Sequence, residues 1–165
     1  MITSNQGSIL VIGYGNALRS DDGAGCRVAE VVASWQLPYV RSLTVHQLAP
    51  ELAEPLAEAD LAIFIDAYIH PKTKRKPTIQ VQRISSTGCQ PINTALEIGH
   101  LSDPRSLLCL ARQVYGKAPA AYSLLLPGVD WEFGEQVSAL TRKSIDQAVD
   151  FLRTLCTKLV PSNPR

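Results

Sequence analysis

Residues 8–13 read Ser-Ile-Leu-Val-Ile-Gly, a short apolar run that ends in glycine. A continuous run of this kind is typical of a strand that is buried on both faces of a parallel sheet. After the loop 14–20, the apolar residues of the stretch 21–35 recur at the spacing of a helix that packs along one side. Strand, loop and helix in this order predict a β-α unit at the start of the chain.

The same alternation continues along the chain. Residues 40–47 are rich in β-branched side chains, which favours a second strand, and Pro50 marks the first turn of a following helix. The apolar run 61–66 predicts a third buried strand that ends on the carboxylate of Asp66. No crossover helix fits before the alternating stretch 78–84, so we expect this stretch to be an antiparallel edge strand in a hairpin with the third strand.

The second half of the chain contains a long loop, two helices and one strand. Residues 85–102 are polar and contain glycine and proline, which predicts a loop of the kind that is commonly functional. A helix over residues 103–116 begins with an Asp-Pro pair and ends in glycine. A last buried strand over 121–126 and a long helix over 138–159 follow. The fold class is α/β with a mostly parallel sheet.

Composition limits the possible classes of protein. The 165 residues are 45% hydrophobic and 19% charged, which is typical of a folded domain. We expect one domain over residues 1–160 and a disordered tail over 161–165. The net charge of +1 gives no general attraction to nucleic acid or to a membrane surface. No apolar run approaches the roughly 20 residues that span a bilayer, so we expect a soluble, monomeric protein without either partner.

The four cysteines are widely spaced and include no C-x-x-C pair, and the N-terminus does not resemble a signal peptide. This pattern predicts reduced thiols in a cytoplasmic protein. Cys89 is a conceivable nucleophile, but no feature of the sequence assigns it an activating base, so an inert loop cysteine is the simpler interpretation. The four are Cys26, Cys89, Cys109 and Cys156.

Ligands of open α/β sheets collect outside the carboxyl ends of the strands. The loop 13–25 after the first strand and Asp66 after the third are therefore the first places to look for chemistry. The loop carries two glycines of a dinucleotide fingerprint, but Leu18 occupies the third glycine position and two aspartates would repel a pyrophosphate. The sequence also lacks a phosphate-binding P-loop and a G-x-S-x-G nucleophile elbow.

Carboxylates and histidines remain as the candidate groups. Asp21 or Asp22, together with Asp66 and one histidine, would form a ligand set that suits nickel or zinc and leaves positions open for substrate. Each carboxylate also has an ordinary structural explanation. Asp22 can interact with the dipole at a helix start, and Asp66 can cap the turn that follows its strand.

Three histidines compete for the third position. His100 ranks first because its place just before a helix N-terminus favours the neutral ring that a metal ligand needs, although a hydrogen bond to backbone would also explain it. His46 ranks second because it ends the second strand. His70 ranks last because it lies beside Pro71 in a basic loop over 72–76 that reads as a solvated turn.

Several short segments stand in a recognisable order along the chain. They are Gly-Tyr-Gly-Asn-Ala-Leu at 13–18, Asp-Asp-Gly at 21–23, His-Gln-Leu-Ala-Pro-Glu-Leu-Ala at 46–53, Ile-Asp-Ala at 65–67, Gly-His-Leu at 99–101 and Trp-Glu-Phe-Gly-Glu at 131–135. Together these segments resemble a known family, the nickel-iron hydrogenase maturation endopeptidases. The segment 46–53 and the helix 103–116 resemble the branch that serves bidirectional, pyridine-nucleotide-linked hydrogenases.

The resemblance implies a three-layer α/β/α fold with a five-stranded sheet in which only the strand at 78–84 is antiparallel. It implies a peptidase that removes the C-terminal extension of a hydrogenase large-subunit precursor after nickel insertion. It further implies that Asp22, Asp66 and His100 recognise nickel carried by the precursor and hold the scissile bond beside the site. Whether the metal polarises the carbonyl or activates water stays open.

The family is often classed as aspartic-type, but this chain has no D-[ST]-G repeat, and a nearby histidine fits a metal site better than an aspartate dyad. Two positions depart from the family pattern. Asp22 stands where several members carry glutamate, and the stretch 137–139 reads Val-Ser-Ala where Leu-Ser-Pro is usual. The first change shortens a ligand, and the second affects only how the last helix begins.

Two other functions remain open from the sequence. A non-catalytic maturation chaperone would use the same pocket to hold nickel or the precursor, and it would bind without releasing a peptide. A nucleotide-binding enzyme is compatible with the α/β architecture, and a dinucleotide titration without saturation would exclude it.

Overall fold

The computed structural model describes residues 7–71, 75–93 and 101–159, so the tail expected at 161–165 lies outside the described residues. A five-stranded sheet in the order β2-β1-β3-β5-β4 runs through the protein. Neighbouring strands are parallel except for β4, which is antiparallel to β5. The strands are β1 (Ile9–Tyr14), β2 (Val40–Val45), β3 (Leu61–Ile69), β4 (Gln80–Ile84) and β5 (Ala120–Gly128).

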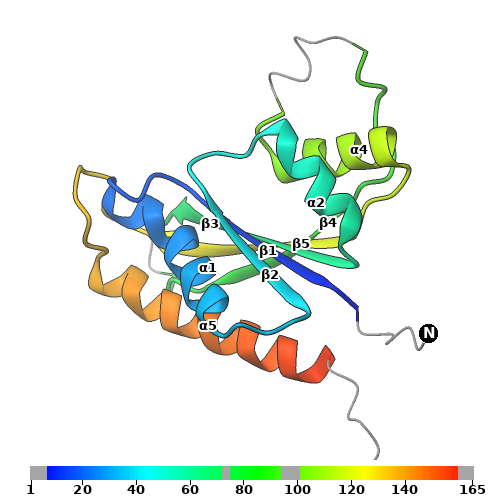
Figure 1. Ribbon diagram of the computed structural model, residues 1–165. Helices are drawn as coiled ribbons and strands as arrows, with labels where there is room; N and C mark the ends of the chain where they lie inside the picture. The colour runs from blue at the N-terminus through cyan, green and yellow to red at the C-terminus, as the bar shows by residue number, and fades with distance from the viewer. Residues whose placement is uncertain (1–6, 72–74, 94–100, 160–165) are drawn as a thin grey trace, which may run out of the picture.

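Helices cover both faces of this sheet (Figure 1). Helices α1 (Ala24–Ser34) and α5 (Ala139–Leu159) lie on one face, and α2 (Ala53–Glu58) and α4 (Pro104–Tyr115) lie on the other. Short 3-10 turns, η1 (Ser20–Gly23) and η2 (Pro50–Leu52), lead into α1 and α2. The three-layer α/β/α fold is therefore confirmed. None of the described helices combines the length and the apolar character that crossing a membrane requires.

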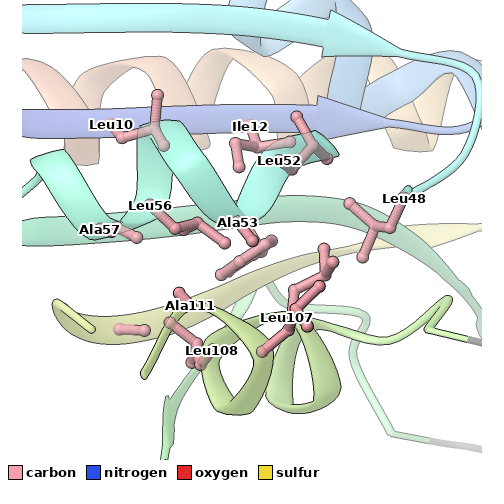
Figure 2. Close-up of a cluster of buried hydrophobic side chains, with 14 of the residues drawn as sticks. Leu10, Ile12, Leu48, Leu52, Ala53, Leu56, Ala57, Leu107, Leu108 and Ala111 are labelled. Carbon is pink, nitrogen blue, oxygen red and sulfur yellow. The ribbon is translucent and has the colours of Figure 1, made fainter. Parts of the chain in front are cut away.

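The alternation of side chains along each strand builds two hydrophobic cores. On β1, Leu10 and Ile12 face α2 and α4, while Ile9 and Val11 face α1 and α5. Figure 2 shows the first core, in which Leu56 of α2 lies among the buried side chains that fill the space between β1 and the two helices. Burial on both faces explains why the first strand is a continuous apolar run in the sequence.

The predicted hairpin between the third and fourth strands is wrong. Strand β4 is antiparallel, as expected, but it pairs with β5 in a register that places Gln82 opposite Ser123. The edge of β3 that the hairpin would need is occupied by β5, which pairs with β3 along its whole length from Leu61 to Ile69. The later strand therefore lies between two strands that are consecutive in the sequence.

Strand β3 also extends beyond the predicted end at Asp66. Its pairing with β1 ends at Ile65, but its pairing with β5 continues to Ile69, which lies opposite Gly128. Asp66 is thus the first residue of β3 that has no pairing partner on β1. It lies inside β3 and not at the end of the strand.

The prediction of four reduced thiols is wrong for two of them. Cys89 and Cys109 form a disulfide, while Cys26 and Cys156 are free and buried. The bond forms because the segment after β4 folds back along α4, where Gln113 accepts a hydrogen bond from the Ile92 amide at 2.8 Å. Because Cys89 is bonded, it is not available as a nucleophile in this state.

Gly116 ends α4 in a left-handed conformation with φ 79°, and its amide bonds to the Arg112 carbonyl at 2.9 Å. We expect Gly116→Ala to lower the free energy of unfolding by about 1 kcal/mol, because a Cβ atom disfavours this conformation. Asparagine tolerates it better, so Gly116→Asn should cost less. Urea denaturation of the two variants measures both values, and equal losses would show that backbone conformation is not the cause.

Candidate functional site

The order in which successive strands are added to the sheet reverses at β1. The connection through α1 leads to β2 on one side of β1, and the connection through α2 leads to β3 on the other side. The two helices lie on opposite faces (Figure 1), so the carboxyl ends of β1 and β3 form the topological switch point at which ligands of open α/β sheets bind. The loop that carries Asp22 and the part of β3 that carries Asp66 both lie at this position.

Two glycines allow the loop after β1 to fold tightly onto the sheet. Gly15 has φ +136°, and a Cβ atom there would lie 2.0 Å from the backbone oxygen of Asp22. A Cβ atom on Gly25 would lie 2.2 Å from the backbone oxygen of Ile65. The start of α1 therefore lies directly on β3, and this close approach brings Asp22 toward Asp66.

The two carboxylates are both half-buried. Asp22 accepts a hydrogen bond from the Asn16 amide through Oδ2 at 2.8 Å, and its Oδ1 has no hydrogen-bond partner within the described part of the chain. Asp66 accepts from the amide of Ala67 through Oδ1 at 2.8 Å. Asp22 is thus held through Oδ2, and among the described residues its Oδ1 is left without a partner and is available to a ligand.

Burial is the main cause that raises the pKa of Asp66, the negative charge of Asp22 adds to it, and the net pKa is about 6. The Ala67 amide and the Tyr14 hydroxyl oppose this shift because both favour the ionised carboxylate. Burial and the charge of Asp66 in turn raise the pKa of Tyr14. Asp22 and Asp66 are therefore close enough to interact, and the Tyr14 hydroxyl stays protonated beside them.

The raised pKa of Asp66 makes a prediction about stability. Between the ordinary value of 3.8 and the folded value of about 6, the folded protein binds more protons than the unfolded chain does. This carboxyl should therefore reduce the free energy of unfolding as the pH rises through that window, by on the order of 2 kcal/mol in full. Asp66→Asn should remove this loss. Urea denaturation from pH 4 to 7 tests it, and identical profiles for both proteins would contradict it.

The carboxylate pair offers oxygen ligands to a divalent cation. Within residues 7–71, 75–93 and 101–159, no group of three or more His, Cys, Asp or Glu side chains could hold a metal ion. His100, the third predicted ligand, lies outside the described residues. The donors that are placed, Asp22 and Asp66, fit part of a site that needs at least one further ligand.

The structure does not bring the other two histidines to the pair. His46 is exposed just after β2, which ends at Val45. His70 follows β3, where its amide bonds to the Gly128 carbonyl at 2.9 Å and its ring lies edge-on to that of Tyr68. Of the basic loop, Arg75 is exposed and residues 72–74 lie outside the described part.

The residue pattern left Asp21 or Asp22 as the candidate and the family resemblance selected Asp22, and the structure gives the two side chains different surroundings. The Asp21 side chain is 0% exposed. It accepts hydrogen bonds from the amides of Val129, Asp130 and Ser138 at 2.8, 2.9 and 2.7 Å, and from the Ser138 hydroxyl at 2.8 Å. Burial raises its pKa, but these bonds outweigh burial, and the net shift is downward. Asp21 therefore has a structural role, and Asp22 is the candidate ligand.

Solved structures share this architecture. The hydrogenase maturating endopeptidase HybD from E. coli has a TM-score of 0.70 and 21% identity, covering 92% of this chain and 93% of that chain. The [NiFe] hydrogenase maturation protease HycI from Thermococcus kodakarensis has a TM-score of 0.69 and 18% identity, covering 94% and 96%. No model of a protein family and no curated protein matches the chain. The α/β fold of this chain is thus the fold of hydrogenase maturation proteases.

Proposed function

We propose that this protein is an endopeptidase that removes the C-terminal extension of a nickel-iron hydrogenase large-subunit precursor. One observation carries the proposal. Asp22 and Asp66 form an interacting carboxylate pair at the carboxyl ends of β1 and β3, in a fold shared with hydrogenase maturation proteases. A half-buried carboxyl with a raised pKa, such as Asp66, at the carboxyl ends of parallel strands is typical of functional sites.

We propose that the nickel ion of the precursor is recognised by Asp22, Asp66 and His100. The free Oδ1 atom of Asp22 and the ionised form of Asp66 supply oxygen donors, and His100 would supply nitrogen. The nickel is then part of the substrate. A precursor without nickel would offer these carboxylates no cation, which would restrict cleavage to loaded precursors.

In this mechanism the residues of the chain act by position and charge. Asp22 is held by the Asn16 amide, and Asp66 by the Ala67 amide, so both carboxylates are oriented before the substrate arrives. Holding the metal would place the adjacent peptide bond beside the carboxylate pair. The Tyr14 hydroxyl favours the ionised form of Asp66. We prefer this metal-assisted scheme to an aspartate dyad, although the raised pKa of Asp66 also suits a proton-carrying acid.

The substrate would belong to the bidirectional, pyridine-nucleotide-linked hydrogenases, and the enzyme would be a cytoplasmic monomer. The segment 46–53 supports this choice of substrate because its residues resemble that branch, and its position is compatible with contact to a substrate. It follows β2 and leads through η2 into α2, so it begins at the same edge of the sheet as the carboxylate pair. A substrate that reaches the pair would pass near this segment.

The test is intact mass spectrometry of a hydrogenase large-subunit precursor after incubation with this protein. One sample carries nickel and the other is nickel-free. We expect a defined C-terminal peptide to be lost only from the loaded precursor. Loss from both forms would remove nickel recognition from the proposal. Binding of the loaded precursor without any change of mass would instead favour the non-catalytic maturation chaperone.

A further inference from the structure

Strand β3 continues past the end of its neighbour β1. Its pairing with β1 ends where Ile65 lies opposite Gly13, whereas its pairing with β5 on the other side continues to Ile69. Within the described part of the chain, residues 66–69 therefore have a neighbouring strand on one side only. The other side of these residues is an open edge of the sheet, and it begins at Asp66.

Two hydrogen bonds show which residues face this open edge. The Leu61 amide donates to the Ser8 carbonyl, just before β1, at 3.1 Å, and the His70 amide donates to a carbonyl at the end of β5 at 2.9 Å. Successive residues of a strand direct their backbone groups to opposite sides, so the odd-numbered residues of β3 face β1 and the even-numbered ones face β5. The amide and carbonyl groups of Ala67 and Ile69 therefore point to the side on which β1 has ended.

The Asp66 carboxylate lies at the start of this open edge. The Ala67 amide, which would be the next donor to β1, donates instead to Asp66 Oδ1 at 2.8 Å. Among residues 7–71, 75–93 and 101–159, no backbone hydrogen bond joins the Ala67 carbonyl or the Ile69 amide and carbonyl to another element on this side. The Ile69 side chain is 73% exposed, so the far end of the edge is open to solvent. Three backbone groups beside the carboxylate are thus available to another chain.

The open edge of β3 differs from the outer edge of the sheet. The outermost strand, β4, exposes Gln82 and Arg83, and polar or charged side chains on an edge strand discourage pairing with other chains. Residues 67–69 read Ala-Tyr-Ile and carry neither a charge nor a proline. An unprotected strand edge of this kind is complementary to an extended peptide, because a peptide backbone offers donors and acceptors at the matching spacing.

We propose that the open edge of β3, residues 67–69, binds the C-terminal segment of the precursor as an added strand. The segment would lie in line with β1, and its backbone would bond to the Ala67 carbonyl and to the amide and carbonyl of Ile69. This inference rests on the proposed function and states in which form the substrate is held. A peptide on this edge lies along the strand that carries Asp66, so its scissile bond is held beside the carboxylate pair.

A second copy of this chain is the other conceivable partner of the edge, and the length of the edge disfavours it. Three extended residues span about 10 Å. A stable interface between folded proteins buries about 800 Å² on each partner, which so short an edge does not supply. A single extended segment needs less, because the nickel of the precursor would contribute to its affinity at the same place.

Hydrogen exchange of single amides in the free protein, followed by NMR, tests whether the edge is open. His70 is the internal control, because its amide is bonded to β5 and the neighbouring Ile69 amide points the other way. We expect the Ile69 amide to exchange on the order of 100-fold faster than the His70 amide. Equal protection of the two amides would show that the edge is already occupied and would overturn the proposal.

The functional test compares Ile69→Pro with Ile69→Ala. Both variants lose the isoleucine side chain, but only proline removes the amide donor, and proline is tolerated on a strand edge where that amide faces solvent. Intact mass spectrometry follows processing of nickel-loaded precursor. We expect kcat/KM of Ile69→Pro to be at least about tenfold below that of Ile69→Ala, which is about 1.4 kcal/mol. The alanine variant should process like the wild type.

The other results each decide the question. Equal kcat/KM values for the two variants would overturn the added strand and leave the endopeptidase intact. A lower urea midpoint for Ile69→Pro than for Ile69→Ala would show that the amide is bonded within the chain, which also overturns it. If the wild type binds the loaded precursor without cleaving it, the endopeptidase is refuted, and calorimetry then compares the variants. Weaker binding by Ile69→Pro would support the edge, and equal affinity would refute it.

Discussion

Asp66→Asn is expected to lower the rate of precursor processing by about 10²–10⁴-fold. Asparagine keeps the shape and the oxygen that accepts from the Ala67 amide, but it removes the negative charge that a cation or a proton transfer needs. The same variant is expected to be more stable than the wild type above pH 6, because it no longer buries a charge beside Asp22. Loss of activity with a gain in stability separates a functional role from unfolding.

Asp146→Asn is the matched control, because Asp146 is exposed on α5 and should contribute to neither property. Single-turnover cleavage of nickel-loaded precursor measures activity, and urea denaturation at pH 8 measures stability. A processed product formed at the wild-type rate by Asp66→Asn would exclude the carboxylate from the mechanism. A loss of stability in that variant would contradict the proposed burial of charge.

Asp21→Ala is expected to lower the free energy of unfolding by about 3 kcal/mol. The change leaves the amides of Val129, Asp130 and Ser138 without their acceptor in a region where the side chain is fully buried. It also loosens the loop that carries Asp22, although the backbone bonds between Ser20 and Gly134 remain. Processing should therefore weaken, because the position of Asp22 relative to Asp66 is less well fixed.

The pH dependence of stability distinguishes this carboxylate from its neighbour. The folded-state pKa of Asp21 is lowered, so its contribution is present above the unfolded value of 3.8 and is lost as the pH falls below it. Asp66 has the opposite sign. Asp21→Asn, which keeps one acceptor oxygen, should cost less than Asp21→Ala. Equal costs in urea denaturation would show that the hydrogen bonds to Asp21 contribute little.

Much of the fold follows from local patterns. The buried strand at 8–13, the helix that Asp103 begins and Gly116 ends, and the antiparallel stretch at 78–84 are all confirmed, because each depends on residues that are close in the sequence. The wrong predictions concern which strands pair with each other. Strand β4 pairs with β5, and β3 extends to Ile69 because it pairs with β5 along its whole length. Strand β5 comes from a later part of the chain, so no local pattern reveals these pairings.

For the candidate site too, the local features were predicted from the sequence and the long-range contacts were not. The position of Asp66 at the carboxyl side of an apolar run indicated a functional carboxylate, and the structure places Asp22 beside it. The local pattern alone could not separate Asp21 from Asp22, and only the resemblance favoured Asp22, because the groups that bind Asp21 lie 108 to 117 residues later. The Cys89–Cys109 disulfide was missed for the same reason. Wide spacing in the sequence gave no sign that the segment before residue 93 folds back along α4.

The contacts of Asp21 also determine when this part of the structure can form during synthesis of the chain. A chain leaves the ribosome from its N-terminus, so the loop with Asp22 emerges long before Val129, Asp130 and Ser138 exist. Until those residues are made, the Asp21 carboxylate has none of the four donors that fix it. The loop that carries Asp21 and Asp22 therefore reaches its final position only when the segment after β5 has been synthesised.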